Sequence, residues 1–408
     1  MKDLLFITHF TQVPGEQGNG RFHYIAEKIN KIDYDVEIVT SNFSHKKKKQ
    51  RVVTQEQLNE SSYKLTMLYE PGYKNNVSIR RFYSHYVMSK SLKKYLQNRK
   101  KPDIIYCSVP SLDVAKVAAE YAKKNNIKFI IDIQDLWPEA FKMVFNFPLI
   151  GDILFYPMKK KADYIYSTAD DIVAVSQTYA NRALQINNKC KKAHVVFLGT
   201  DLDYFDRLSK NNKLMNKPEN EIWLVYIGTL GHSYDLTCVI NALRIIKDKG
   251  IKNIKFVVMG DGPLEEKFKN YAKKQEINIE FTGRLEYGSM VGKLVSCDIA
   301  VNPIKAGSAG SIINKVGDYA AAGLPVLNTQ ESFEYRSLID KYQVGFNCKN
   351  NDEVDLADKL LKLYKDENLR KKMSNNSRRL AREKFDRSET YQEIFRVFCN
   401  NDDLNFNV

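Results

Sequence analysis

The amino-acid sequence predicts an α/β fold made of two doubly wound, Rossmann-like parallel sheets. A chain of 408 residues is too long for one ordinary core and suggests two domains of roughly 200 residues each. In both halves, apolar strand-like segments alternate with helical stretches, which is the pattern of βαβ units. The alternation restarts at Trp223, after a polar segment from Ser209 to Glu221 that is typical of a linker.

Short apolar runs define the predicted strands. In the first half these runs are Leu4–Thr8, Val36–Thr40, Ile104–Cys107, Phe129–Ile133 and Ile172–Val175. Helical stretches between them are Phe22–Ile32, Leu112–Asn125 and Gln177–Gln185. In the second half the strands are Trp223–Ile227, Lys255–Met259, Glu280–Phe281, Ile299–Asn302 and Val326–Asn328. Final helical stretches, Asn368–Lys384 and Ser388–Phe398, suggest a return to the first half. We therefore predict domains at 1–208 and 209–384, and a crossing helix at 385–408.

Composition and charge narrow the class of protein. No run approaches the ~18 apolar residues that span a bilayer, and the apolar N-terminal run is too short for a signal peptide and lacks a small-residue cleavage site. We therefore expect a cytoplasmic protein. The six cysteines lie far apart, without the spacing of a zinc site or a disulfide framework. The net charge of +14 suggests a negatively charged partner or a charged surface to face, which leaves nucleic acid, anionic lipid and phosphorylated substrates open.

The segment Gly307–Asn328 carries the most specific local signal. A short helix with Lys315 and Asp318 ends at Gly323, and Pro325 follows, which is the usual stop signal of a helix. The two charged residues are three apart and share one helical face. A lysine beside bare backbone N–H groups binds an anion, and an acid one turn later accepts hydrogen bonds from two neighbouring hydroxyls. Phosphate and diol together indicate a nucleotide; the alternative is a packed helix with a solvated Lys and Asp.

A glycine-rich loop follows the first strand of each half. The first loop holds Gly15, Gly18 and Gly20, and the second holds Gly228 and Gly231. Ligands of doubly wound sheets bind at the carboxyl ends of such strands, where backbone amides can approach a phosphate. Neither loop has the dinucleotide G-x-G-x-x-G spacing or a Walker lysine, so these motifs do not predict a dinucleotide or ATP.

The chain resembles the family-4 retaining glycosyltransferases of the GT-B fold, especially the fucosaminyltransferase-like branch that builds bacterial surface polysaccharides. The resemblance covers nearly the whole chain and follows seven segments in order. They are DIQDLWPEA (132–140), ADDIVAVSQ (169–177), FLGTDLDYF (197–205), VVMGDGPLEE (257–266), FTGRL (281–285), KVGDYAAAGLPV (315–326) and KFDRSETYQEIF (384–395). The resemblance implies two Rossmann-like domains that face a central cleft, an N-terminal one for the acceptor and a C-terminal one for the nucleotide sugar.

The resemblance also implies roles for single residues on the donor side. Asp318 stands where the second acid of the family's Glu-x7-Glu motif binds the ribose hydroxyls, and Arg284 and Leu285 stand where backbone groups hold the base, usually uracil. The resemblance also places Gly231 with the amides around it at the diphosphate, and Gly18 in a loop that closes over phosphates or acceptor. By their positions, His232 in the phosphate-side loop and Ser311 in the segment before the donor helix are further candidates for contact with the donor.

Several positions depart from the family pattern. The first acid of the motif falls on Gly310, and the usual Arg and Lys diphosphate clamp is absent, so Lys315 becomes the expected cationic partner of the leaving phosphate. Gln134 and Asp135 occupy the place of a common histidine. Asp135 is then the candidate acceptor-side acid or base, or else a cap for the following helix. We expect no metal, because the two Asp-x-Asp sequences lie in a turn and an interdomain segment.

Two basic segments predict the acceptor side. The run 45–51 is rich in lysine, and residues 78–101 interleave aromatic and apolar side chains with eight Lys or Arg. This pattern suits a helix lying on anionic lipid, with a solvated face over a core stripe as the alternative. The runs fit no nucleic-acid module. The proposed membrane or acceptor contacts are Arg80, Arg81, Lys90, Lys93 and Lys94.

Together these observations predict a metal-independent hexosyl- or N-acetylhexosaminyltransferase without a cofactor. It would move a sugar from a UDP-sugar to a polyprenyl-pyrophosphate-linked saccharide, as a peripheral protein on the inner face of the plasma membrane, in capsule or O-antigen synthesis. Two alternatives stay open. One is a GT-B UDP-sugar epimerase, and the other is an inactive nucleotide-sugar-binding scaffold.

Overall fold

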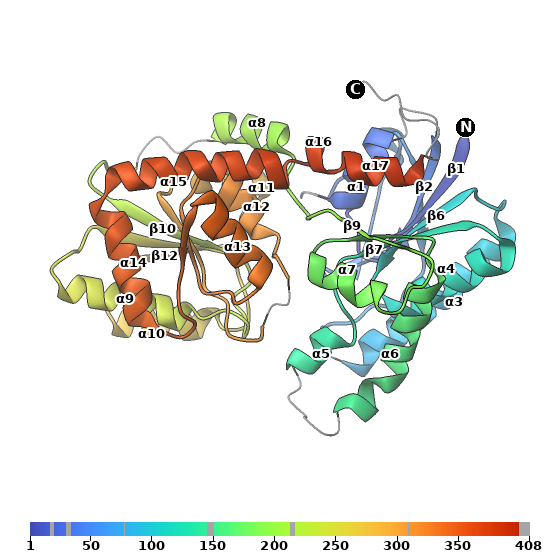
Figure 1. The fold of residues 1–408 in the computed structure, drawn as a ribbon, viewed down its shortest axis with the longest axis horizontal. Coiled ribbons are helices and arrows are strands. Elements are labelled where there is room, and N and C mark those ends of the chain that lie inside the picture. Colours follow the sequence, from blue (N-terminus) through green and yellow to red (C-terminus); the bar gives the residue numbers. More distant parts are fainter. Residues whose placement is uncertain are drawn as a thin grey trace. The chain divides into compact units, whose positions relative to one another are not determined.

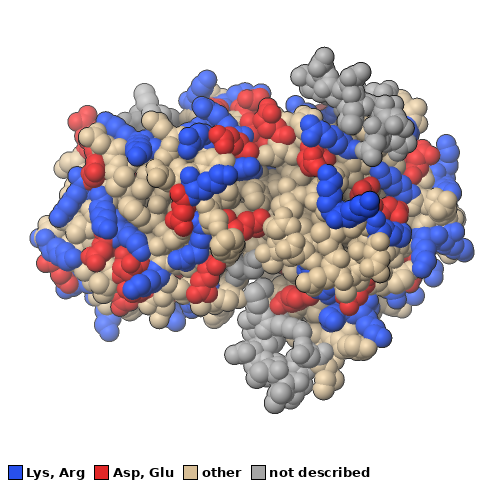
Figure 2. Space-filling view, viewed as in Figure 1, with Lys and Arg blue, Asp and Glu red and all other residues tan. Residues whose placement is uncertain are grey.

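The computed structural model describes residues 1–16, 20–29, 34–76, 78–144, 151–212, 217–308 and 311–399. They form two compact units (Figure 1). The first unit comprises Met1–Val196 together with the segment that begins at Tyr391, and the second comprises Phe197–Thr390. Figure 2 shows Lys and Arg side chains interspersed with Asp and Glu over the face in view.

The first unit is built on a seven-stranded parallel sheet with the order β5-β2-β1-β6-β7-β8-β9. Its strands are β1 (Lys2–Ile7), β2 (Tyr34–Ser41), β5 (Lys64–Leu68), β6 (Ile104–Val109), β7 (Lys128–Ile133), β8 (Asp171–Ala174) and β9 (His194–Val195). A small antiparallel pair, β3 (Phe43–Ser44) and β4 (Lys49–Gln50), follows β2. Strand β1 is an interior strand, and Leu4–Ile7 are fully buried, as expected for a parallel sheet covered on both faces.

Helices connect the strands of the first unit. They are α1 (Arg21–Ile29), α2 (Gln55–Asn59), α3 (Ile79–Asn98), α4 (Leu112–Asn125), α5 (Glu139–Val144), α6 (Gly151–Thr168), α7 (Gln177–Leu184) and α17 (Gln392–Phe398). Helix α3 begins where the Ser78 side chain accepts a hydrogen bond from Arg81 N, which is a standard N-cap. Helix α17 returns to this unit, and the Phe398 ring packs 6.0 Å from Phe6 and 5.0 Å from Tyr106 (Figure 1).

The second unit has a six-stranded parallel sheet with the order β12-β11-β10-β13-β14-β15. Its strands are β10 (Ile222–Ile227), β11 (Ile254–Met259), β12 (Ile279–Gly283), β13 (Ile299–Asn302), β14 (Val326–Asn328) and β15 (Gly345–Asn347). Its helices are α8 (Leu202–Asn212), α9 (Leu236–Asp248), α10 (Glu265–Lys274), α11 (Tyr287–Leu294), α12 (Lys315–Ala321), α13 (Phe333–Tyr342), α14 (Glu353–Lys365), α15 (Glu367–Leu380), the π-helical turn Ala381–Phe385 and α16 (Arg387–Thr390).

Alternate residues of β10 enter two different hydrophobic cores. Trp223 and Val225 belong to one core cluster, whereas Leu224 and Tyr226 belong to the other. Because successive side chains of a strand point to opposite faces of its sheet, this sheet is covered on both faces. The predicted fold of two doubly wound, Rossmann-like parallel sheets is confirmed.

The chain passes from one unit to the other earlier than residue 208, where the sequence placed the domain boundary. Thr200 N donates to Phe385 O at 2.7 Å, and α8 packs on α11, so residues 197–208 belong with the second unit. The predicted linker Ser209–Glu221 is helical up to Asn212, because α8 continues through its first residues. The Asp201 carboxylate accepts from Tyr204 N in the first turn of α8.

Candidate functional site

The order of the second sheet reverses direction at β10. From β10 the chain adds β11 and β12 on one side and β13 to β15 on the other. Ligands of open α/β sheets bind beyond the carboxyl ends of the strands at such a reversal. The segments at this place are the loop that follows Ile227 and the loop that follows Asn302.

Glycines bring three loops at this edge into backbone contact. Gly260 N donates to Gly283 O at 2.9 Å, and a Cβ at Gly260 would lie 1.9 Å from Gly228 O. A Cβ at Gly262 would lie 2.5 Å from Leu230 O. Since only glycine leaves room for so close an approach, the loop that follows β10 is fixed in place by the loop that follows β11.

The amino group of Lys315 lies against this loop. Its Nζ is 4.0 Å from the ring centroid of Tyr226 and 4.1 Å from that of Tyr234, and 2.8 Å from the position that a Cβ of Gly228 would take. The Nζ is buried and has no hydrogen-bond partner among the described residues. Burial therefore holds the pKa of Lys315 well below its usual range. An unpaired buried ammonium is costly, and an anion beside Gly228 would remove that cost.

Asp318, on the same helix, is held by two hydroxyl groups. Its Oδ1 accepts from Thr200 Oγ1 and from Tyr287 OH, each at 3.0 Å. Burial raises the pKa of Asp318 to about 6, against the hydrogen bonds from Tyr287 and Thr200, which lower it. The structure thus places Lys315 and Asp318 close to different segments of the second unit, with the cation at the glycine loop and the acid at the start of α11.

The raised pKa of Asp318 predicts a pH-dependent stability. Between the ordinary pKa of 3.8 and about 6, the folded protein binds a proton that the unfolded chain has released. The stability that Asp318 contributes is therefore fully present below pH 3.8 and is lost as the pH rises through about 6. We expect the melting temperature of the wild type to fall relative to that of Asp318→Asn between pH 4 and pH 7, in thermal scans of both proteins. Parallel pH profiles would contradict the shifted pKa.

The structure places the other predicted donor residues around the same strand ends. Gly231 is half-buried in the loop after β10, where a Cβ would make only an ordinary contact with Thr229 Cγ2 at 3.8 Å, and His232 next to it is exposed. Arg284 is exposed directly after β12, whereas Leu285 packs against the core. Ser311 is buried. Gly18 and Gly310 lie outside the described residues.

Buried amides hold the segment around Ser311. Gln330 Nε2 donates to Ser311 O at 2.6 Å, and Gln330 Oε1 accepts from Asn302 Nδ2 at 3.2 Å. Asn302 Nδ2 also donates to Asn328 Oδ1 at 2.9 Å. These three amides are fully buried at the carboxyl ends of β13 and β14. They fix the start of the segment that leads into α12.

Asp135 follows β7 in the first unit and is engaged locally. Its Oδ1 accepts from Leu136 N at 2.9 Å and Tyr179 OH at 3.3 Å, and its Oδ2 accepts from Trp137 Nε1 at 3.2 Å. Burial raises the pKa of Asp135. Through these contacts the Asp135 carboxylate orders the turn into α5. A catalytic role of Asp135 stays a prediction. Trp137 is buried and packs 4.9 Å from Phe141.

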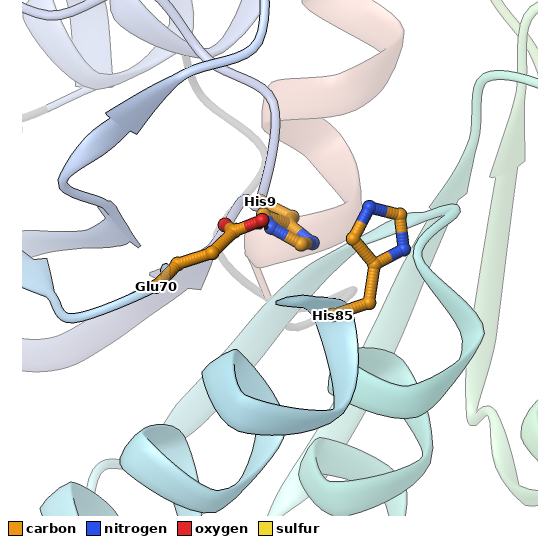
Figure 3. Close-up of side chains that lie close together, drawn as sticks. All are labelled: His9, Glu70 and His85. Atoms are coloured by element: carbon orange, nitrogen blue, oxygen red, sulfur yellow. Dashed lines mark hydrogen bonds and ion pairs between the residues drawn. The ribbon is translucent and has the colours of Figure 1, made fainter. Parts of the chain in front are cut away.

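One group of the described residues has the composition of a metal site. Figure 3 shows His9, Glu70 and His85, whose ligand atoms lie within 4.8 Å of one another. Glu70 Oε2 pairs with His9 Nε2 at 2.6 Å, and Glu70 Oε1 accepts from Ser84 Oγ at 2.7 Å. Burial and nearby positive charges, among them Arg81, lower the pKa of His85 far below its usual range. Both oxygens of the Glu70 carboxylate are thus already paired within the protein, so we assign no metal to this group.

The predicted basic contacts lie on α3 in two different environments. Arg80, Lys90, Lys93 and Lys94 are exposed, whereas Arg81 is half-buried with its guanidinium 4.8 Å from the Trp137 ring centroid. No helix of the described residues combines the length and the apolar character that crossing a membrane requires.

The sequence did not indicate the partners of the two donor-side charges. Tyr226 and Tyr234 enclose Lys315, and Thr200 and Tyr287 hold Asp318. They come from four separate segments, so no local spacing relates them to α12. The only available signal was the position of Tyr226 and Tyr234 on either side of the second glycine loop.

Comparisons with known proteins agree with this arrangement. Residues 21–204 match the family described as Glycosyltransferase Family 4, and residues 207–380 match Glycosyl transferases group 1. The probable glycosyltransferase WbjE of Pseudomonas aeruginosa is 24% identical over 237 residues, which cover 56% of this chain and 58% of WbjE. A Campylobacter jejuni α-1,4-N-acetyl-D-galactosaminyltransferase, named for an acceptor carried on PP-undecaprenol, is 25% identical over 217 residues, 49% of this chain and 58% of that enzyme.

The matches with these curated relatives thus span less than two thirds of the relatives' own lengths. A solved structure covers more. HepE of Anabaena, crystallised with UDP-glucose, superposes with a TM-score of 0.67 at 14% identity and covers 98% of this chain and 99% of its own. One glycosyltransferase family matches the first part of the chain and another matches the second, and each part contains one Rossmann-like sheet. The chain therefore has the GT-B fold of the family 4 and group 1 glycosyltransferases.

Proposed function

We propose that this protein is a retaining glycosyltransferase of the fucosaminyltransferase-like branch. It transfers a hexose or N-acetylhexosamine from a UDP-sugar to a lipid-linked saccharide during synthesis of a bacterial surface polysaccharide. One observation carries the proposal: the buried amino group of Lys315, without a hydrogen-bond partner among the described residues, faces the glycine loop after β10. Asp318 lies one turn later on the same helix.

In this proposal the second unit binds the donor. The diphosphate lies between Lys315 and the amides around Gly231, and the ribose hydroxyls lie at Asp318. The backbone of Arg284 and Leu285 receives the base, and the segment at Ser311 faces the sugar. The complex of HepE with UDP-glucose supports a nucleotide sugar as the donor.

Charge on the leaving diphosphate explains the chemistry. When the bond to the sugar breaks, negative charge grows on the phosphate, and a positioned ammonium in a site without water stabilises that charge strongly. The desolvation cost of Lys315 arises on folding and not on donor binding, since its Nζ is already buried. No metal or cofactor is required by this mechanism. The acceptor hydroxyl passes its proton towards the departing phosphate, and Asp135 is the proposed acid or base on the acceptor side.

The first experiment tests the donor site and its nucleotide. Thermal shift assays with UDP, GDP, ADP, CMP and a panel of UDP-sugars should show stabilisation by UDP and one UDP-sugar. A ligand at 100 times its Kd adds about 2.7 kcal/mol. The shift should disappear in Asp318→Ala. A protein that responds to no nucleotide would contradict the donor site. Binding without transfer or hydrolysis would indicate the scaffold, and conversion of the bound UDP-sugar to an epimer would indicate the epimerase.

We propose that the first unit binds the acceptor at an anionic membrane surface on the inner side. Exposed apolar side chains of α3 and α6 support this location, and the rings of Phe82, Phe141 and Phe155 connect the two helices. The exposed apolar residues are Ile79, Tyr83, Tyr86, Ile153, Leu154 and Tyr156. Exposed Arg80, Lys90, Lys93 and Lys94 provide positive charge for lipid headgroups. The acceptor named for the Campylobacter relative supports a polyprenyl-pyrophosphate carrier.

Removing exposed apolar side chains should release the protein from vesicles. We expect the double variant Ile153→Ser/Leu154→Ser to bind vesicles of anionic lipid at least tenfold more weakly. The reason is that two aliphatic side chains that become buried in the lipid contribute more than ~1.4 kcal/mol to binding. Co-sedimentation measures the binding. The control is Phe333→Ser, which removes a side chain of the second unit that is 85% exposed. Equal binding by the double variant and the wild type would contradict this surface.

A further inference from the structure

Four basic side chains of the first unit gather near the carboxyl end of β1. We call His45, Lys48, Arg81 and His85 the cationic cluster. His45 and Lys48 lie in the turn between β3 and β4, and Arg81 and His85 lie in the first turns of α3. The His85 ring lies 4.7 Å from that of His9, which follows β1 (Figure 3).

Two full charges of the cluster share one aromatic ring. Lys48 Nζ lies 4.6 Å from the ring centroid of Tyr73, and the Arg81 guanidinium lies 5.6 Å from the same centroid. Lys48 Nζ is also 3.3 Å from His45 Nδ1. Arg81 and His85 both lie over Trp137, at 4.8 Å and 5.9 Å from its ring centroid. The rings thus hold the basic groups together.

The acids near the cluster compensate its positive charge only in part. The two carboxylates that act on its charges are Glu70 and Asp135, and both are engaged elsewhere, as described above. Within the described part of the chain neither Lys48 nor Arg81 forms an ion pair with either acid. Burial and then Arg81 lower the pKa of Lys48 to about 8, and burial, Lys48 and Arg81 lower the pKa of His45 to about 3. The basic groups therefore weaken one another's protonation.

Two nitrogen atoms of the cluster point to a ligand more directly. Arg81 Nε and His85 Nε2 are buried and have no hydrogen-bond partner among the described residues. His85 is only 2% exposed, whereas His45, Lys48 and Arg81 are half-buried and keep the cluster open to solvent. A buried donor without a partner costs stability unless a ligand satisfies it, and Arg81 Nε is such a donor whichever tautomer His85 adopts.

We propose that the cationic cluster binds a phosphate or diphosphate group, which in the proposed function is the diphosphate of the lipid-linked acceptor. Guanidinium and ammonium groups are the side chains that bind phosphate oxygens most strongly. A bound diphosphate supplies the missing negative charge and gives Arg81 Nε an acceptor. The exposed lysines 46, 47 and 49 surround the site with positive charge that attracts such an anion.

Calorimetry on the full-length protein tests this site with geranyl diphosphate. Saturating UDP is present throughout, so that the donor site is occupied. We expect Lys48→Gln and Arg81→Gln each to weaken binding of geranyl diphosphate about tenfold or more. Lys101→Gln and Lys124→Gln, which change exposed lysines of the same unit outside the cluster, should bind as the wild type does. Inorganic pyrophosphate and geraniol distinguish the two parts of the probe, and a phosphate site requires that pyrophosphate competes and geraniol does not.

The outcomes separate this site from the donor site. Unchanged binding in Lys48→Gln and Arg81→Gln, with both variants folded, would overturn the proposal. So would a loss of UDP affinity in these variants, since the cluster would then belong to the nucleotide. Because Lys48 is only half-buried, Lys48→Gln should fold, and it tests the site by itself if Arg81→Gln does not fold. If UDP does not bind but geranyl diphosphate binds as described, the donor assignment fails and this site stands.

Discussion

Lys315→Met should stabilise the free protein and abolish its response to UDP. Methionine fills the space between Tyr226 and Tyr234 without burying a charge, so the cost of the unpaired ammonium disappears. A gain of about 1–3 kcal/mol is expected from the desolvation of one polar group, which raises the melting temperature by several degrees. Loss of the cation at the leaving phosphate should lower kcat about 10²- to 10³-fold. Thermal scans with and without UDP, and turnover of the UDP-sugar, measure both effects.

The matched control is Lys305→Met, which removes an exposed lysine from the loop after β13. It should change neither the melting temperature nor the UDP response. For Lys315→Met we expect a higher melting temperature together with a lost response to UDP. This combination distinguishes a ligand-binding lysine from a structural one. A less stable variant that still responds fully to UDP would show that Lys315 supports the fold and does not contact the diphosphate.

Gly260→Ala should unfold the edge of the donor site. Gly260 has a φ of +148°, and a Cβ there would lie 1.9 Å from Gly228 O. The backbone carbonyl cannot move aside as a flexible side chain would, so the loop after β10 must shift. Backbone strain and overpacking together cost about 3 kcal/mol, which lowers the melting temperature by roughly 6–12 °C. The displaced loop should also weaken UDP binding in the thermal shift assay.

Gly250→Ala separates strain from contact. Gly250 has a φ of +86°, but nothing lies within 4 Å of the position of its Cβ. This control should cost about 1 kcal/mol from the left-handed backbone alone and leave UDP binding unchanged. Equal losses in the two variants would mean that the contact with Gly228 has no role in holding the loop.

The central strands could be predicted from sequence because they are buried on both faces and therefore apolar throughout. The edge strands could not. Lys64–Leu68 begins with an exposed lysine, and Gly345–Asn347 is half-buried, so neither gives a continuous apolar run. These two edge strands form because the neighbouring parallel strand supplies their backbone hydrogen bonds. The end of the first domain was placed too late because contacts, and not composition, assign residues 197–208 to the second unit.

The site was predictable where its residues share one helix. Lys315 and Asp318 gave a local signal, since spacing on a helix determines which side chains are neighbours. The tyrosines around Lys315 and the amides that hold Ser311 depend on which strand ends are adjacent, and that order follows from the whole sheet. His9 and His85 are 76 positions apart in the sequence and yet lie with their rings 4.7 Å apart, which no pattern in the sequence indicates.

The packing of Phe398 on Phe6 and Tyr106 has a consequence for biosynthesis. Strand β1 is synthesised long before α17, the last helix of the described residues, which completes the core around β1. Until then the nascent chain presents apolar surface at this place, where chaperones or neighbouring chains can bind. A ribosome that stalls before Tyr391 would release a product whose second unit can fold while its first remains vulnerable to proteases.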